Sequence, residues 1–217
     1  PAAGTARLDA TTASGVAQEA FFIAEHDVAR RGGGHERPDV LGLVLAVDGT
    51  LVLGGSGYRD YDGRAPLARA DAQSVITVEP EFPRSTGAGE SGPDATLSAE
   101  GVGGSFTVGG VTVSRSLAVE SGALVVRDVV DVTGEARAVA WHWQLRGTLD
   151  ATRWQWTVGT VRCEATQTGD APPITRDSGT SYDDYTRMDT HPIVRQTAML
   201  TAGRHALTTR IACDVVR

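Results

Sequence analysis

Short apolar segments separated by turn residues run along the whole chain, and helical periodicity is almost absent. Stretches of apolar and β-branched residues bounded by Gly, Asp, Ser or Pro are typical of short strands joined by turns. The pattern predicts an all-β fold with little helix, a large two-layer antiparallel β-sandwich. The expected strands lie near residues 19–28, 39–47, 50–55, 73–79, 104–108, 110–119, 122–132, 136–146, 153–165, 193–201 and 205–216.

The clearest local prediction is a hairpin between residues 39–47 and 50–55. The first segment reads DVLGLVLAV and is apolar on both alternating faces, which predicts an interior strand covered on both sides. Asp48–Gly49 follows it, and both residues tolerate positive φ, as a tight hairpin turn requires. The side chains expected to point into the core are Leu41, Leu43 and Leu45.

Tryptophan pairs mark two later strands. Trp141 and Trp143 share one face of their segment, and Trp154 and Trp156 share a face of the next. Such a pair can form a platform for a sugar ring, but packing in a core is the commoner use of tryptophan. We therefore assign all four to packing.

The length of 217 residues is normal for one large β-sandwich, so we expect a single domain over residues 1–217. No apolar window is long enough for a membrane span, and the N-terminal residues lack a signal-peptide pattern. The chain begins without Met, which suits a processed product or a domain of a longer protein.

The charge of the chain argues against some partners. All 20 basic residues are Arg, and the formal net charge is −7. Nucleic-acid-binding domains usually carry a basic face, so no nucleic-acid partner is expected, and no membrane partner either. A polyanion would have to meet a local cluster of Arg.

Two cysteines, Cys163 and Cys213, lie in strand-like segments. They can pair if those strands are neighbours, or they can be two buried small apolar residues, and the spacing does not decide between the two.

Residues 35–57, HERPDVLGLVLAVDGTLVLGGSG, carry a family resemblance. They resemble the signature of heparinase II/III-like polysaccharide lyases, in which a His-x-His-x-Asp run enters a hairpin that ends in Asp-Pro-Gly. His35, Asp39 and Gly57 match that signature without a gap. The loop and strand up to residue 80 and the Arg-bearing segment SRSLAVESGALVVRDVVDV continue the resemblance, which covers most of the chain.

The resemblance implies that the chain is the C-terminal sandwich of such an enzyme. In the family, a helical toroid precedes the sandwich, and the cleft between them carries out β-elimination on uronate-containing polysaccharide. The expected partners are therefore an anionic polysaccharide and a helical toroid domain of the same protein, and the expected location is secreted or periplasmic. Alone, the sandwich is expected to be weakly active or inactive, because elimination needs a carboxylate neutraliser, a base and an acid.

The resemblance also implies which residues form the site. His35 takes the place of the catalytic His, and Tyr61, in the Tyr-bearing loop, is our preferred acid. The residues expected to bind substrate are Tyr58, Arg31, Arg37, Arg59, Arg64 and Arg69. Arg binds carboxylate or sulfate with two parallel hydrogen bonds, as a polyanionic sugar requires.

Taken without the resemblance, the same residues have ordinary roles. A loop His beside Arg is more often a solvated surface residue, and a loop Tyr often anchors the loop to the core. Asp60, Asp62 and Asp71 alternate with the Arg residues and can neutralise them. His26, His142, His191 and His205 have no catalytic or metal partner at a readable spacing and are assigned structural roles.

The metal ligands of the family are replaced. Metal-containing members bind a structural zinc through the second His of the signature, the Asp before Pro-Gly and a His before Asn. Arg37, Gly55 and Gln73 stand at these positions. Because neither Arg nor Gly ligates Zn²⁺ through a side chain, no metal and no other cofactor is expected. The loss of all three ligands also favours an alternative function, a non-catalytic carbohydrate-binding or structural module.

Overall fold

The structure, a computed structural model, describes residues 4–24, 39–57, 67, 69–82, 95–98, 101–182 and 187–216. Within these residues the chain forms strands and one short 3-10 turn, η1 (Ala70–Ala72). The described part contains no helix with the length and apolar character needed to cross a membrane. The predicted all-β class is therefore confirmed.

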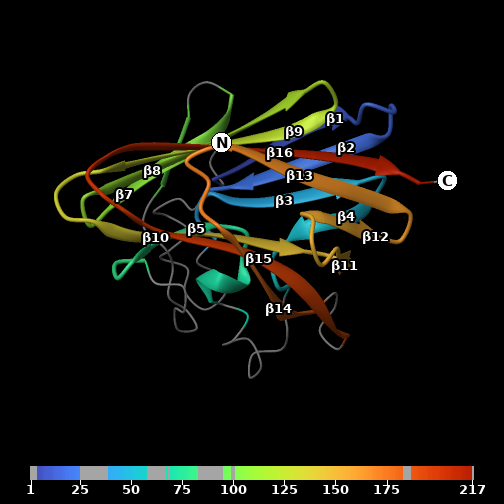
Figure 1. The fold of residues 1–217 in the computed structure, drawn as a ribbon. Coiled ribbons are helices and arrows are strands. Elements are labelled where there is room, and N and C mark those ends of the chain that lie inside the picture. Colours follow the sequence, from blue (N-terminus) through green and yellow to red (C-terminus); the bar gives the residue numbers. More distant parts are fainter. Residues whose placement is uncertain are drawn as a thin grey trace.

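Two eight-stranded antiparallel sheets lie face to face as a sandwich (Figure 1). The first sheet runs in the order β1 (Thr5–Thr11), β2 (Ala17–Ile23), β3 (Gly42–Val47), β4 (Thr50–Gly54), β10 (Arg137–Leu145), β15 (Met188–Leu200), β14 (Ile174–Tyr182), with β5 (Ile76–Glu79) also paired to β10. The second runs β11 (Thr148–Leu149), β12 (Gln155–Val158), β13 (Val161–Gly169), β16 (Gly203–Val215), β9 (Ala123–Val132), β8 (Val111–Glu120), β7 (Val102–Val108), β6 (Ala95–Leu97).

The core lies between the sheets and is built by the alternation that the sequence shows. On β10, the side chains of Trp141, Trp143 and Leu145 point inward and are buried. Trp143 meets Trp154 edge to face, with ring centroids 5.4 Å apart. The indole nitrogen of Trp156 donates to the carbonyl of Val52 at 2.9 Å, so this buried polar group is satisfied. The assignment of the tryptophans to packing is confirmed.

The predicted hairpin is present as β3 and β4. Asp48 and Gly49 have φ of 50° and 72°, as a two-residue turn between twisted strands requires. Leu41, Leu43 and Leu45 are all buried, as expected. The expectation that both faces of this strand are covered was wrong in one respect, because Val44 and Ala46 on the other face are only partly buried.

Several strands were missed or merged in the sequence-based prediction. Residues 153–165 form a hairpin, β12 and β13, instead of one strand. The strands that were not predicted are β1, β6, β11 and β14. β1 and β14 are edge strands of the first sheet, and most of their residues are exposed or only half buried, so their apolar alternation is weak.

Cys163 and Cys213 form a disulfide. They are directly opposite each other on β13 and β16, with Cα atoms 4.0 Å apart. Both side chains are buried on the core face of the second sheet. The alternative that the sequence left open, two unpaired buried cysteines, is therefore excluded.

Candidate functional site

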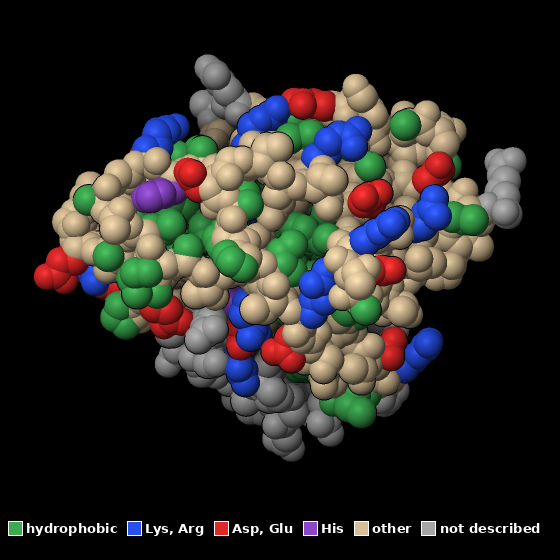
Figure 2. Space-filling view, in the orientation of Figure 1, with side chains coloured by type: hydrophobic (Ala, Val, Ile, Leu, Met, Phe, Trp, Pro, Cys, Tyr) green, Lys and Arg blue, Asp and Glu red, His purple; other side chains and the backbone are tan. Residues whose placement is uncertain are grey.

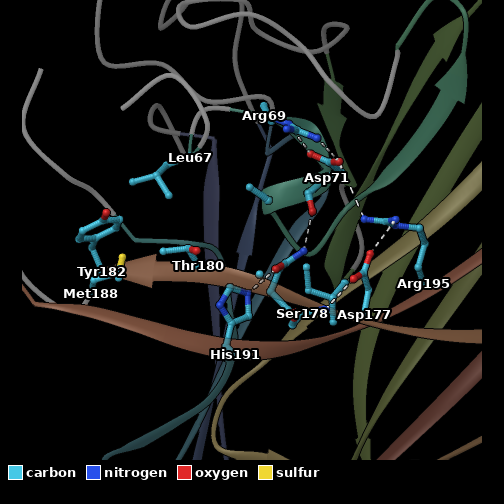
Figure 3. A pocket seen from close by; sticks show the side chains of 14 residues that line it. Leu67, Arg69, Asp71, Asp177, Ser178, Thr180, Tyr182, Met188, His191 and Arg195 are labelled. Atoms are coloured by element: carbon cyan, nitrogen blue, oxygen red, sulfur yellow. Dashed lines mark hydrogen bonds and ion pairs between the residues drawn. The ribbon is translucent and has the colours of Figure 1, made fainter. Parts of the chain in front are cut away.

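Two cavities share Tyr182 at the end of β14. Alternation on β10 and β15 turns Gln144, His191 and Arg195 to the face of the first sheet opposite the core. The first cavity, which we call the His191 cavity, measures about 380 Å³ (Figure 3). Its lining residues are Leu67, Arg69, Asp71, Ala72, Gln144, Asp177, Ser178, Gly179, Thr180, Tyr182, Met188, His191, Ile193 and Arg195.

The second cavity, the Asp39 cavity, measures about 460 Å³. Its lining residues are Ile23, Asp39, Val44, Leu51, Gly54, Gly55, Gly57, Gln73, Arg146 and Tyr182. It therefore combines the ends of the predicted hairpin with three positions of the family signature.

Gly57 brings the end of β4 against β14. It has φ of 76°, and a Cβ there would lie 1.9 Å from the backbone oxygen of Tyr182. The amide of Tyr182 donates to the carbonyl of Ser56 at 2.8 Å. Only Gly meets both the positive φ and this close approach, so the closing Gly of the signature fixes Tyr182 between the two cavities.

A buried arginine on the second sheet binds the backbone that leads into the Asp39 cavity. Arg115 forms two hydrogen bonds with Asp128, at 2.7 and 3.0 Å, and both side chains are almost fully buried. Its Nη1 donates to the carbonyls of Leu41, at 3.1 Å, and Ser74, at 3.3 Å. Leu41 has φ of 53°, a strained value for Leu. Arg115 thus reaches across the sandwich and holds the turn that follows Asp39.

His191 is held by a chain of hydrogen bonds. Gln144 donates from Nε2 to the carbonyl of Asp71 at 2.6 Å, and its Oε1 lies 2.5 Å from Nε2 of His191. Because a carbonyl only accepts, the amide of Gln144 is fixed, and Nε2 of His191 must carry the hydrogen. In the neutral ring, Nδ1 is then an acceptor. It is buried and has no hydrogen-bond partner among the described residues.

The imidazole of His191 is neutral at pH 7. Burial, and to a smaller extent the charge of Arg146, lower its pKa from 6.5 to about 4, while Asp189 opposes the shift. The ring has room because its cross-strand neighbour is Gly179, where a Cβ would lie 3.1 Å from Cε1 of His191.

The charged side chains of the His191 cavity are paired with one another. Arg69 binds Asp71 with two hydrogen bonds, at 2.9 and 2.7 Å. Arg195 lies 3.9 Å from Asp71 and 3.5 Å from Asp177, as Figure 3 shows. Among the described lining residues, two arginines face two aspartates, so with a neutral His191 the charges of these residues balance. For Arg69, the sequence left open substrate binding or neutralisation by Asp71, and the structure shows that this pairing exists.

The Asp39 cavity does not fit the zinc of the metal-containing enzymes whose signature residues 35–57 resemble. Gly55 and Gln73 lie side by side, and a Cβ at Gly55 would be 2.1 Å from Oε1 of Gln73. The Gln73 amide is buried and donates to the carbonyl of Leu67 at 2.8 Å. Within the described part of the chain, no group of three or more His, Cys, Asp or Glu could hold a metal ion. A glutamine side chain fills the space where the resemblance puts a ligand.

Of the residues expected to form the site, Arg69 alone is described, and it lines the His191 cavity. Outside the described residues lie Arg31, His35, Arg37, Tyr58, Arg59, Tyr61 and Arg64. Sequence reasoning missed Tyr182, Gln144 and Arg195, and gave His191 a structural role only. No local motif marks them, because strands β10, β14 and β15 meet only through the sheet pairing.

No family model and no curated protein matches the chain. Several solved structures match its fold. A structure of heparinase III, the BT4657 gene product, superposes with a TM-score of 0.77 at 14% identity, over 98% of this chain and 35% of that chain. Another heparinase III gives 0.71 at 12% identity, over 99% of this chain and 36% of that one.

The heparan sulfate lyase HepC from Pedobacter heparinus gives a TM-score of 0.69 at 13% identity, over 98% of this chain and 35% of that chain. The chain thus spans about a third of the length of these heparinases. The resemblance to the C-terminal sandwich of heparinase II/III-like enzymes is confirmed at the level of the fold.

Proposed function

We propose that this chain is the sandwich part of a polysaccharide lyase, which acts by β-elimination on uronate-containing polysaccharide together with a helical toroid domain of the same protein. The observation that carries the proposal is the match in fold to heparinase III over 98% of this chain but only 35% of that chain. A chain that corresponds to one third of an enzyme is expected to supply part of its cleft.

The chemistry of β-elimination supports a cleft that is formed by the sandwich and a second domain together. β-Elimination needs a base for the C5 proton, an acid for the leaving oxygen and a neutraliser for the carboxylate. His191, with a pKa of about 4, is too weak a base to remove such a proton near neutral pH. We therefore assign the base to His35 and the acid to Tyr61, with the substrate carboxylate neutralised partly by the toroid.

The Asp39 cavity is the expected place for these groups. Asp39 follows His35 by four residues, and Gly57 directly precedes Tyr58. An extended chain spans at most about 3.6 Å per residue, so His35 is tethered within roughly 14 Å of the cavity lining. The substrate-binding roles of Tyr58, Arg31, Arg37, Arg59 and Arg64 belong to the same proposal, as do an anionic polysaccharide partner and a secreted or periplasmic location. The substrate-binding role of Arg69 belongs to the His191 cavity, which this residue lines.

A product assay tests the proposal. The protein that contains this chain together with its helical domain is incubated with heparan sulfate, other uronate polysaccharides and a uronate-free control. Unsaturated uronate is followed by its ultraviolet absorbance. We expect product from at least one uronate polysaccharide, and little or none from the 217-residue chain alone.

The second candidate is a non-catalytic carbohydrate-binding module. It is favoured by the poor fit of Gly55 and Gln73 to a metal. Retention on immobilised polysaccharide without any unsaturated product, from the longer protein as well as from the chain, would favour the module and overturn the lyase.

A further inference from the structure

We propose that the His191 cavity binds one uncharged, hydroxyl-bearing sugar ring of the polysaccharide, which donates a hydroxyl hydrogen to Nδ1 of His191. The proposal rests on the proposed function for the kind of polymer, and on the cavity itself for the kind of sugar. In a lyase, the cavity would then be a subsite for a neutral sugar of the polysaccharide, next to the uronate that reacts.

The buried acceptor is the first observation. His191 is 2% exposed, and its Nδ1 has no hydrogen-bond partner among the described residues. The tautomer is fixed from the other side of the ring, through Gln144 and the carbonyl of Asp71. An unsatisfied buried polar atom costs about 1–3 kcal/mol. A ligand hydroxyl that reaches this atom removes the cost, so the cavity is prepared for a donor.

A donor without a partner lies in the same wall. Nε of Arg195 is buried, and no hydrogen bond to it is found within the described part of the chain. Asp177, which pairs with Arg195, has a carboxylate that is 56% exposed and can accept. A hydroxyl group donates and accepts at once, so a sugar ring with several hydroxyls matches this alternation of acceptor and donor.

The balance of charge selects an uncharged ring. Arg69 and Arg195 face Asp71 and Asp177 at 2.7–3.9 Å. A sulfate or carboxylate in the cavity would lie beside both aspartates, which repel it, or would have to displace one of them from its arginine. A neutral ring needs no such rearrangement. Basic and acidic side chains are also interspersed over the face of the molecule that Figure 2 shows.

The size and the rim of the cavity fit a ring as well. A volume of about 380 Å³ lies within the usual range for small-molecule sites. Tyr182, Leu67 and the exposed Met188 provide an apolar side. Sugar rings carry an apolar C–H face beside their hydroxyls, and an aromatic ring is its usual partner in proteins.

Methyl β-D-glucopyranoside is a suitable probe, with D-glucuronate and inorganic sulfate as anionic comparisons. The chain is labelled with ¹⁵N-histidine, and the imidazole nitrogens are followed by NMR during titration. We expect the pyranoside to shift Nδ1 of His191 upfield as that nitrogen accepts a hydrogen bond. The apparent Kd should not depend on salt, because an uncharged ligand releases no ions.

The variant His191→Gln keeps a donor for Gln144 and removes the ring acceptor Nδ1, because the amide oxygen of Gln stands at a different place on a flexible side chain. We expect it to weaken binding about tenfold, as the loss of one hydrogen bond implies. His205→Gln, a change at a partly buried histidine on β16 in the other sheet, is the matched control and should leave binding unchanged. If His191→Gln fails to fold, Gly179→Ala serves instead, since its Cβ would lie 2.7 Å from Cδ1 of Ile193 and crowd the imidazole.

Preferential binding of sulfate or glucuronate that weakens with salt would overturn the proposal. So would an unshifted His191 resonance at the highest pyranoside concentration that can be reached. The two proposals fail separately. Sugar binding without any lyase product removes the proposed function and leaves the subsite, whereas product formation without a response at His191 removes the subsite alone.

Discussion

His191 shows how burial decides the behaviour of one side chain. Its ring is enclosed by Gln144 and Gly179, and burial is the main cause of its pKa of about 4. The sequence around it, MDTHPIVRQ, carries no signal of this, because each contact comes from another strand. Single-residue chemistry at this site is a consequence of the sheet topology.

The pKa of His191 predicts a loss of stability in acid. Its pKa is lower in the folded chain than in the unfolded chain, so the unfolded chain binds more protons between pH 6.5 and about pH 4. The contribution of His191 to the free energy of unfolding is therefore complete above pH 6.5. It decreases by about 3 kcal/mol as the pH falls to about 4. Urea unfolding across this range, compared with His191→Gln, measures it. Parallel curves for the two proteins would show that His191 does not cause the loss.

At the scale of elements, alternation predicted the strands that turn one apolar face to the core. β8, β9 and β10 and the hairpin of β3 and β4 carry such a pattern, and the turn between β3 and β4 was located to the residue. β14 reads ITRDSGTSY, is mostly exposed and pairs along its length with β15, apart from the bridge between Tyr182 and Gly57, so its strand character comes from backbone pairing that no side-chain pattern records. The His191 cavity depends on β14, which is why most of its residues could not be predicted.

Leu43 tests the register of β3. Its side chain is 1% exposed in the core, so Leu43→Ala should lower the free energy of unfolding by about 2–5 kcal/mol. Leu51, on the partner strand and 36% exposed, is the control, and its truncation should cost less than about 1 kcal/mol. Equal losses in denaturant unfolding would mean that the two faces of the hairpin are misassigned.

Arg115 tests the connection between the two sheets. Arg115→Met leaves Asp128 buried and unpaired and removes the donor to Leu41 and Ser74, so a loss of about 3–5 kcal/mol is expected. Arg127→Met removes an exposed pair with Glu120 from the neighbouring strand and should cost less than about 1 kcal/mol. Similar unfolding free energies for the two variants would contradict the role given to Arg115.

At the scale of the whole molecule, sequence and structure agree on the fold, but the sequence pointed to only one of the two cavities. The resemblance of residues 35–80 led to the sandwich of heparinase II/III-like enzymes, which the solved structures match over nearly the whole chain. The Asp39 cavity contains Asp39, Gly55, Gly57 and Gln73, all of them from that segment. The His191 cavity was not foreseen, because it joins η1, β10 and the pair β14 and β15, three parts that are far apart in the sequence.

The Asp39 cavity predicts a protein that needs no zinc. Gln73 fills the space beside Gly55, so elemental analysis after purification should find no stoichiometric zinc. The unfolding temperature should be the same with and without chelator. One zinc per chain, together with a lower unfolding temperature in chelator, would contradict the replacement of the metal by the Gln73 side chain.

The most direct test is the initial rate of unsaturated uronate formation by the longer protein with His35→Ala. If the sandwich supplies the base of a lyase cleft, the rate on an accepted polysaccharide falls by at least about 100-fold, the usual contribution of general base catalysis. The unfolding midpoint should stay close to that of the unchanged protein, as for a surface substitution. A rate near that of the unchanged protein would contradict the assignment of His35 and the role of this sandwich in catalysis.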